Sequence, residues 1–329
     1  MLTVGICTWN RAAALRRTLE SMERLEPIDG PWELIVVDNN STDDTPAVLA
    51  DFATRLPLRA MHEPRAGKSN AANLVLREAR GTWLVWTDDD VIVAPRWLRA
   101  YAEAFEQWPS ADIFGGPIRP LFEGTPAPWL ARASSYMPGV YAERELGPEP
   151  RRLEHSHDFP YGANMAFRTS AQRSYTFDPR IGPRPGSELR GEEVELIGRM
   201  VADGRECRWV PDAAVQHVIP PHRQSLRFAR AHEVGHGEYV AIMEPEAMVP
   251  RHDRSRRVGE IPLWLWRRAI TAELRFRARF LLQRDAPERW VPAMCWASTH
   301  WGFIATTRRL ARERARMPAP EQAGQSQPA

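Results

Sequence analysis

The sequence has few cysteines, a single lysine and almost no net charge. The three cysteines, Cys7, Cys207 and Cys295, are far apart and odd in number. They provide neither a disulfide framework nor the ligand spacing of a metal site, which favours a reducing compartment such as the cytosol. A net charge of +2 over 329 residues gives no overall field that would select nucleic acid as a partner.

The sequence also lacks internal repeats. Its first residues, MLTVGICTWNR, do not have the basic region and long apolar run of a signal peptide, and we expect a core strand there. Of the 44 basic residues, Lys68 is the only lysine, so its position stands out from the arginine-rich background. The length suits one large domain, or a domain with an appendage.

The central feature of the sequence is an acidic cluster within residues 82–95, TWLVWTDDDVIVAP. Residues 83–87 form an apolar run that predicts a buried strand, and Asp88, Asp89 and Asp90 follow it directly. An isolated run of three acids is more often a solvated turn. Here the apolar residues on both sides place the acids at the end of a strand, where a divalent cation would relieve their mutual repulsion.

Strands and helices alternate in the first third of the chain. Strands are predicted at residues 2–8, 32–37, 58–62, 83–87 and 112–116, and helices at 12–25, from an N-cap at Thr45, at 68–80 closed by Gly81, and from Pro95. The alternation predicts an α/β fold, with a mostly parallel sheet covered by helices on both faces. Ligands bind beyond the carboxyl ends of such strands, where Thr8, Asp38 and Asp88 to Asp90 fall.

The alternation stops after Pro117. Residues 118–158 are predicted to be irregular apart from a short helix around 129–136, residues 159–169 to form a broken strand, and residues 180–190 to be mobile. A helix at 192–203, strands at 207–211 and 213–219, and helices at 225–243, 263–284 and 290–316 follow. We therefore expect a catalytic domain over residues 1–222, a helical extension over 223–316 and a disordered tail over 317–329.

The helical extension has aromatic and basic residues on the same segment. Residues 263–282 interleave Trp264, Trp266, Phe276 and Phe280 with five arginines, which are too many charges for a membrane span. This pattern fits an amphipathic helix lying on the inner face of the cell membrane, and equally a helix that packs back on the catalytic domain. We expect a cytoplasmic protein in either case.

Seven motifs occur in order between residues 2 and 217. They are ICTWNR, VVDNNSTDDT, RAGKSNAANLVLREARG, WTDDD, GANMAFR, GEEVELIGRMVADG and WVPDAAVQH. Each is weak alone, but their order and spacing resemble glycosyltransferase family 2, the inverting enzymes with a Rossmann-like GT-A type fold. The resemblance implies transfer of a sugar from a nucleotide-sugar donor, with uridine as the expected base, to a hydroxyl of a saccharide or lipid-linked acceptor. It also implies a Mn²⁺ or Mg²⁺ ion.

The resemblance assigns roles to particular residues. The residues it implies for the nucleotide sugar are Thr8, Arg11, Asp38, Lys68, Asp88 and Asp89. For the metal it implies Asp90 of the DxD motif, with Asp88 and His217, and for the acceptor side Asn164 and Met165. Without the resemblance, Asp38 fits a turn cap, Lys68 a solvated residue and His217 a structural histidine equally well or better.

The resemblance also implies that the catalytic base lies in the acidic pair Glu192 and Glu193. The second member is usually aspartate in the family, and here it is Glu193. At a helix start the macrodipole favours the ionised form, so we expect Glu193 to be charged at neutral pH. Successive helical residues point about 100° apart, so we expect only one of the two to face the donor.

Two other functions fit parts of the pattern. A nucleotidyltransferase that makes the sugar nucleotide would need a glycine-rich basic loop near the first strand, and CTWNRAAA is not such a loop. A non-catalytic scaffold on the same fold would have no need for both the acidic cluster and the acidic pair. The inverting glycosyltransferase is the function that the sequence favours.

Overall fold

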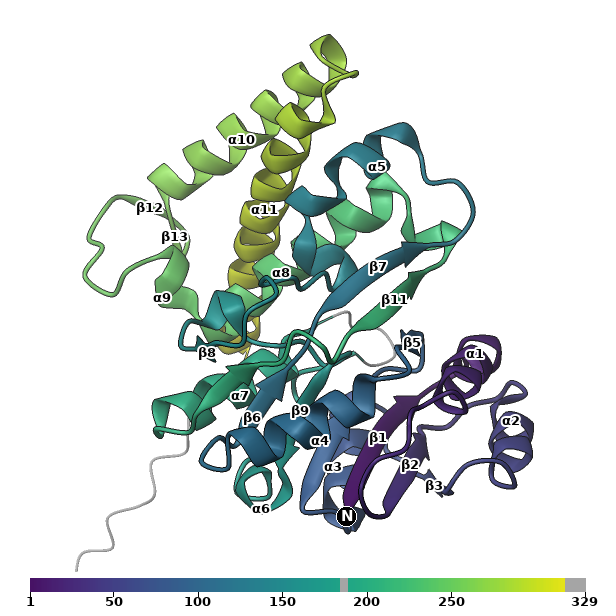
Figure 1. Ribbon diagram of the computed structural model, residues 1–329. Coiled ribbons are helices and arrows are strands. Elements are labelled where there is room, and N and C mark those ends of the chain that lie inside the picture. Colours follow the sequence, from purple (N-terminus) through teal and green to yellow (C-terminus); the bar gives the residue numbers. More distant parts are fainter. Residues whose placement is uncertain (184–188, 317–329) are drawn as a thin grey trace, which may run out of the picture.

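The computed structural model describes residues 1–183 and 189–316. Residues 184–188 of the segment predicted to be mobile, and all of the predicted tail at 317–329, lie outside these ranges. Those two predictions stay untested. Figure 1 shows the strands near the N-terminus in the lower part of the molecule and the long C-terminal helices α10 (Leu263–Leu282) and α11 (Pro287–Arg316) in its upper part.

The described residues form thirteen strands, eight of them in segments predicted as strands and five in segments that were not. They are β1 (Leu2–Thr8), β2 (Trp32–Asp38), β3 (Leu58–His62), β4 (Trp83–Trp86), β5 (Val91–Val93), β6 (Ile113–Gly115), β7 (Ile118–Phe122), β8 (Arg152–Leu153), β9 (Met165–Arg168), β10 (Cys207–Trp209), β11 (Val215–Ile219), β12 (Arg257–Val258) and β13 (Ile261–Pro262).

The α-helices and 3₁₀ helices complete the chain. The α-helices are α1 (Ala12–Met22), α2 (Thr45–Phe52), α3 (Lys68–Glu78), α4 (Trp97–Gln107), α5 (Pro128–Ala133), α6 (Thr169–Gln172), α7 (Glu192–Ala202), α8 (Leu226–Met243), α9 (Pro245–Met248), α10 (Leu263–Leu282) and α11 (Pro287–Arg316). The 3₁₀ helices are η1 (Ser134–Tyr136), η2 (Pro138–Tyr141), η3 (Ser156–Asp158) and η4 (Pro221–Arg223).

Eight strands form the main sheet in the order β3-β2-β1-β4-β9-β6-β10-β8. β1 pairs in parallel with β2 and β4, and β2 with β3, as the alternating pattern predicts. β9 is antiparallel to both β4 and β6, and β8 is antiparallel to β10. The prediction of a mostly parallel α/β sheet is confirmed.

Helices cover both faces of this sheet because its central strands are apolar on both sides. In β2, Leu34 and Val36 pack into a cluster with α1, α2 and α4, whereas Ile35 and Val37 pack into a second cluster with α3, α6 and α7. All four side chains are fully buried. The central strands therefore read as continuous apolar runs, which is typical of parallel sheets buried on both faces.

A second, three-stranded sheet corrects one prediction. Residues 118–122, predicted to be irregular, form β7, which pairs in parallel with β11, while β5 pairs with the other edge of β11 in antiparallel orientation. His217 in β11 lies opposite Val91 in β5 and Pro120 in β7. These pairings join segments about a hundred residues apart and place His217 beside the acidic cluster that precedes β5.

The helix ends differ slightly from the prediction. Asp44 rather than Thr45 is the N-cap of α2, and α4 begins at Trp97, two residues after Pro95. α3 ends at Glu78 and is not closed by Gly81. Gly81 is needed for another reason, because a Cβ atom there would lie 2.5 Å from the backbone nitrogen of Thr3 in β1.

The C-terminal helices pack against the earlier part of the chain. One buried cluster combines Leu130 and Tyr141 with Phe276, Trp290 and other residues of α10 and α11. Another combines Ile181 with residues of α8, α10 and α11. Among the described residues, no helix is long and apolar enough to cross a membrane.

Candidate active site

The carboxyl ends of β1, β2 and β4 lie side by side and hold the first part of the site. Thr8 at the end of β1 is in register with Asp38 at the end of β2. The hydroxyl of Thr8 donates a hydrogen bond of 2.7 Å to Oδ2 of Asp89, which follows β4. Nη1 of Arg11 lies 3.0 Å from Oδ1 of the same carboxylate. Burial raises the pKa of Asp89, and the charge of Arg11 offsets part of this effect.

Asp90 is surrounded by cationic groups from three parts of the chain. Its Oδ2 lies 2.7 Å from Nη1 of Arg11 and 3.1 Å from Nη1 of Arg223 in η4. Its Oδ1 lies 3.5 Å from Nε2 of His217. Burial alone would raise the pKa of Asp90, but His217 and the two guanidinium groups hold it well below its usual range. Asp90 is therefore ionised throughout the physiological pH range.

The chemistry of Asp90 and His217 fits a divalent cation. Nδ1 of His217 lies 2.8 Å from the carbonyl oxygen of Tyr141. That contact places a proton on Nδ1, so that Nε2 is the ring nitrogen that faces Asp90. Asp90 raises the pKa of His217, and a cation held between the two side chains would take the place of the Nε2 proton. Among the described residues, no group of three or more His, Cys, Asp or Glu side chains is arranged for a metal. Two protein ligands are compatible with a cation that also binds substrate phosphates and water.

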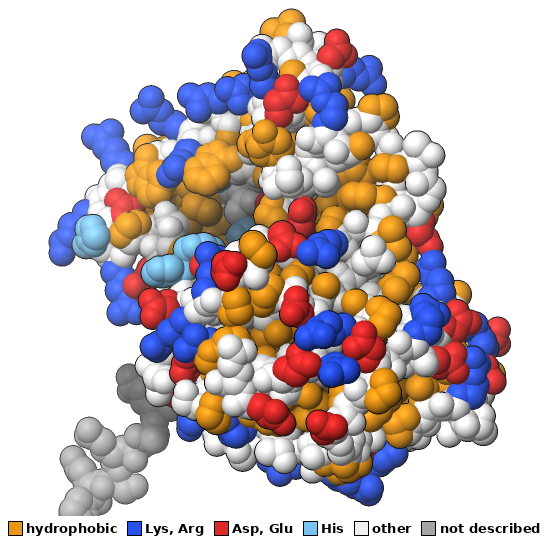
Figure 2. Space-filling view, viewed as in Figure 1, with side chains coloured by type: hydrophobic (Ala, Val, Ile, Leu, Met, Phe, Trp, Pro, Cys, Tyr) orange, Lys and Arg blue, Asp and Glu red, His pale blue; other side chains and the backbone are white. Residues whose placement is uncertain are grey.

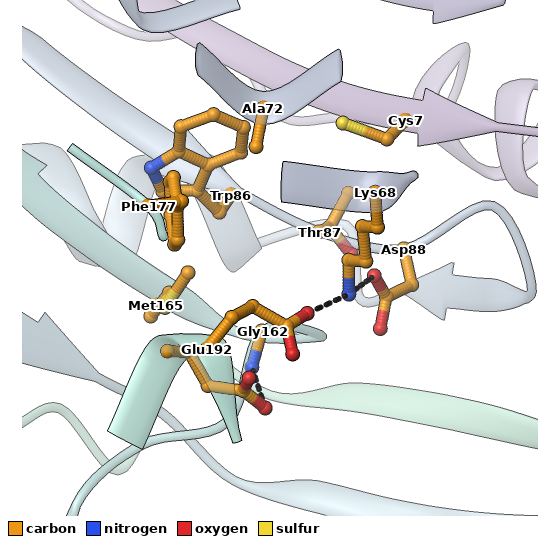
Figure 3. A pocket seen from close by; sticks show the side chains of 11 residues that line it. Cys7, Lys68, Ala72, Trp86, Thr87, Asp88, Gly162, Met165, Phe177 and Glu192 are labelled. Atoms are coloured by element: carbon orange, nitrogen blue, oxygen red, sulfur yellow. Dashed lines mark hydrogen bonds and ion pairs between the residues drawn. The ribbon is translucent and has the colours of Figure 1, made fainter. Parts of the chain in front are cut away.

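A small cavity beside these residues brings together the second part of the site (Figure 3). Its volume of about 20 Å³ is enough for a water molecule. Nζ of Lys68, in the first turn of α3, lies 2.8 Å from Oδ1 of Asp88 and 3.6 Å from Oε1 of Glu192. Glu193 also lines the cavity, with Oε1 3.4 Å from the backbone nitrogen of Gly162. Both carboxylates line this cavity, and the expectation that only one of the two faces the donor stays a prediction.

The protonation of Glu193 differs from the prediction. Burial and, to a smaller extent, the negative charge of Glu192 raise the pKa of Glu193 to about 8, against the opposing effect of Lys68. One oxygen of each glutamate, Oε2, is buried without a hydrogen-bond partner in the part of the chain that the structure describes. Desolvation thus outweighs the macrodipole, and Glu193 carries a proton at neutral pH in the absence of substrate.

The helix that carries the two glutamates begins at a glycine that no other residue replaces easily. Gly191 is the N-cap of α7 and has φ of +107°. A Cβ atom there would lie 2.7 Å from the ring of Tyr239 in α8. Tyr239 therefore packs directly against the N-cap of α7.

The remaining predicted residues occupy different positions. Oδ1 of Asp38 accepts a hydrogen bond from the backbone nitrogen of Ser41, and the residue is buried at the carboxyl end of β2. Asn164 is fully buried. Its amide groups bond to Trp97, Tyr101 and the carbonyl oxygens of Pro117 and Ala213. Asn164 therefore holds β9 in place and does not face an acceptor, contrary to the prediction.

Met165 is the one predicted acceptor-side residue that lines the cavity. The other lining residues not predicted from the sequence include Cys7, Trp86, Gly162 and Phe177. Burial raises the pKa of the Cys7 thiol to about 12, so it is not a nucleophile. The most important residue missed is Arg223, whose only signal in the sequence is its position six residues after His217.

The sheet agrees with comparisons to known proteins. Residues 3–176 match the model of glycosyl transferase family 2. The chain belongs to this family. Its fold is of the GT-A type, and α7, β11 and η4 add site residues beyond the matched region.

Curated relatives match this chain over part of their length. It is 27% identical over 256 residues to a pre-mycofactocin glycosyltransferase of Mycobacterium tuberculosis, covering 76% of this chain and 49% of the relative. It is 28% identical over 152 residues to a validoxylamine A glucosyltransferase of Streptomyces hygroscopicus, covering 46% and 36%. The chain thus spans about a third to a half of the length of these relatives.

Solved structures share the fold. A mannosyltransferase from Pyrobaculum calidifontis in complex with GDP-Man and Mn²⁺ superposes with a TM-score of 0.53 at 19% identity, covering 97% of this chain and 76% of that one. TarS 1-349 of S. aureus in complex with UDP gives a TM-score of 0.54 at 13% identity, covering 95% and 91%. At sequence identities of 19% and 13%, these similarities show that the fold is shared.

Proposed function

We propose that this protein is an inverting glycosyltransferase that moves a sugar from a nucleotide-sugar donor to a hydroxyl of a saccharide or lipid-linked acceptor. One observation carries the proposal. Asp90, which faces His217, and Asp88, which lines a cavity with the buried acidic pair of Glu192 and Glu193, both follow directly on β4. A donor phosphate group and an acceptor hydroxyl need these two kinds of group on either side of the sugar.

The residues divide the chemistry between them. Asp38 and Thr8 lie where the nucleoside would bind, and Lys68 and Asp88 lie between them and the cavity. Asp90 and His217 would hold Mn²⁺ or Mg²⁺, the ions that the family implies, and such an ion neutralises the diphosphate leaving group. Solved neighbours contain Mn²⁺ with GDP-Man, or with UDP and GalNAc.

Glu193 is proposed to accept the proton of the acceptor hydroxyl as that hydroxyl attacks the anomeric carbon from the opposite face. Attack from that face inverts the anomeric centre and needs no covalent intermediate. The raised pKa of Glu193 makes the carboxylate a stronger base once it is ionised. Lys68, which lies between Asp88 and the acidic pair, favours that ionised form.

The experiment that tests this function measures release of nucleotide from sugar nucleotides. A panel of uridine- and guanosine-linked sugars is incubated with the protein and Mn²⁺ or Mg²⁺, with and without simple saccharide acceptors. Slow metal-dependent release of nucleoside diphosphate from one donor supports the proposal and identifies the sugar. A nucleotidyltransferase would instead release pyrophosphate from a nucleoside triphosphate and sugar phosphate, and a scaffold would do neither.

We also propose that residues 1–222 carry the donor site and that the helices of residues 223–316 cover it and reach a membrane surface. On α10, Leu274 and Leu281 are 62% and 77% exposed, while Leu265 and Phe276 on the opposite face are buried. Figure 2 shows apolar side chains gathered over α10 with basic side chains along their edge. Such a face suits contact with the headgroups of anionic lipids.

A further inference from the structure

Arg223 joins the acidic cluster from outside the region that matches the family model. It ends η4, which connects β11 to α8, and it is the first residue after the predicted catalytic domain. Its guanidinium group is 14% exposed and lies 3.1 Å from Oδ2 of Asp90. The same oxygen accepts from Arg11 at 2.7 Å. One carboxylate oxygen therefore faces two guanidinium groups.

The two arginines are not equivalent. Arg11 has a second carboxylate partner, Asp89. For Arg223, the structure gives Asp90 as the one carboxylate partner within residues 1–183 and 189–316. Arg11 also lies closer to the shared oxygen of Asp90, at 2.7 Å compared with 3.1 Å for Arg223. Arg223 is thus the cation that Asp90 holds less strongly.

A divalent cation at Asp90 and His217 would compete with Arg223 for the carboxylate. If the cation took the carboxylate, the positively charged guanidinium of Arg223 would be left beside a doubly charged ion. That placement is unfavourable unless an anion is present to accept the hydrogen bonds of Arg223. A diphosphate provides such an anion, because the planar fork of arginine can donate two parallel hydrogen bonds to phosphate oxygens. The turn of η4 places Arg223 within reach of Asp90 and next to the strand that carries His217.

We infer that Arg223 holds the Asp90 carboxylate in the free protein and passes to the diphosphate of the donor when the divalent cation binds. This inference rests on the proposed function. Arg223 then opposes binding of the cation alone and favours binding of the cation together with a nucleoside diphosphate. The exchange couples the two ligands, so that the cation binds firmly only when the donor is present.

The inference is tested by titration calorimetry with Mn²⁺ alone, with UDP or GDP alone, and with each nucleotide in saturating Mn²⁺. The wild-type protein is compared with Arg223→Gln, and with Arg227→Gln as a control that removes an exposed arginine four residues further on. In Arg223→Gln we expect Mn²⁺ alone to bind about 3- to 10-fold more tightly. We expect the nucleotide in Mn²⁺ to bind about 10-fold more weakly. The control should change neither value.

In Arg223→Gln the affinity for Mn²⁺ alone should rise while the affinity for the nucleotide falls. A purely structural role of Arg223 would not change the two affinities in opposite directions. If Arg223→Gln weakens both ligands, or changes neither, the inference is overturned. Arg223→Lys keeps the charge but loses the fork. It should leave the affinity for Mn²⁺ alone near the wild-type value and lower the nucleotide affinity, and a tighter Mn²⁺ site in this variant would also overturn the inference. If the wild-type protein binds neither nucleotide, it is the proposed function that fails.

Discussion

The single lysine of the chain, Lys68, lies with its Nζ 2.8 Å from Oδ1 of Asp88, on the border between the donor side of the site and the acidic pair. Its positive charge lowers the pKa of Glu193, against the larger effect of burial. Lys68 therefore connects the protonation of the proposed base to the residues that contact the donor. This connection can be measured through the pH dependence of the reaction.

We predict that kcat/KM of the wild-type protein rises with pH and levels off above about pH 8, where Glu193 is ionised. A base acts in its deprotonated form, so the rate at pH 6 should be about 100-fold below the plateau. Lys68→Gln removes a charge that lowers this pKa, and the rise should move to higher pH by about one unit or more. Lys68→Arg keeps the charge and should keep the wild-type profile. If kcat/KM of Lys68→Gln rises at the same pH as in the wild type, the charge of Lys68 does not control the protonation of Glu193.

Replacement of Glu193 by Gln should lower transfer by about 100-fold or more while nucleotide and metal affinities stay the same. Glu192→Gln should lower transfer less, because Glu192 is the glutamate that Lys68 contacts. The measurement is single-turnover transfer beside calorimetry of nucleotide binding. If Glu192→Gln has the larger effect, with both variants folded, then Glu192 is the base.

Glu193→Gln should also change how the stability of the folded protein depends on pH. The pKa of Glu193 is raised in the folded state from 4.5 to about 8, so between these values the folded protein binds more protons than the unfolded chain. Its stability therefore falls as pH rises through this range. Glu193→Gln removes this effect, and its Tm should exceed that of the wild type more at pH 8 than at pH 5.

Much of the fold could be predicted from the sequence because its central strands are buried on both faces. The runs at β1, β2 and β3 are apolar or bounded by turns, and their ends were predicted within one residue. The pairing of β7 with β11 was not predicted, because it depends on contacts between distant segments and no local pattern records it. The antiparallel placement of β9 is of the same kind.

In the site, too, some features follow from local sequence and others depend on contacts between distant segments. Strand ends indicate that Thr8, Asp38 and Asp88 to Asp90 lie together, since carboxyl ends of parallel strands share an edge. The protonation of Glu193 depends on burial, which only the folded chain provides. Arg223 is one arginine among many, and its contact with Asp90 follows from the β11 pairing.

Replacement of Asp90 by Asn should lower metal-dependent nucleotide release by about 100-fold or more. The amide keeps the shape but loses the charge that Arg11, Arg223 and His217 face, so some loss of Tm is expected as well. Dependence of the residual rate on Mn²⁺ concentration is the decisive measurement. Asp51→Asn, which changes an exposed carboxylate on α2, is the matched control. A wild-type Mn²⁺ dependence in Asp90→Asn would remove Asp90 from the metal site.

Replacement of Asp38 by Ala should weaken nucleoside diphosphate binding by about 10-fold, because a hydrogen bond to a charged group is lost. Asp38 also accepts a hydrogen bond from the backbone of Ser41, so a turn role alone would lower Tm and leave affinity unchanged. Calorimetry with UDP and GDP, together with a melting curve, separates the two. Equal affinity in both proteins would leave Asp38 as a turn residue.

The outer face of α10 should bind anionic vesicles. Leu274 and Leu281 project from it beside Arg267 and Arg275, for which no ion pair is seen among the residues that the structure describes. Leu274→Asn and Leu281→Asn should each weaken co-sedimentation with phosphatidylglycerol vesicles by about 10-fold, given the value of burying a leucine in an apolar medium. Leu121→Asn, at a 37% exposed position in β7, is the control.

Ionic strength and lipid charge decide between membrane contact and a helix that only packs on its own protein. Arginine attraction to anionic headgroups is screened by salt, so binding should fall between 0.05 and about 0.5 M salt and be weak on phosphatidylcholine. The buried face of α10 already packs in clusters with residues from β11 and from the 130–141 segment. If no vesicles are bound at low salt, that packing is the whole role of the helix, and the exposed leucines have no membrane function.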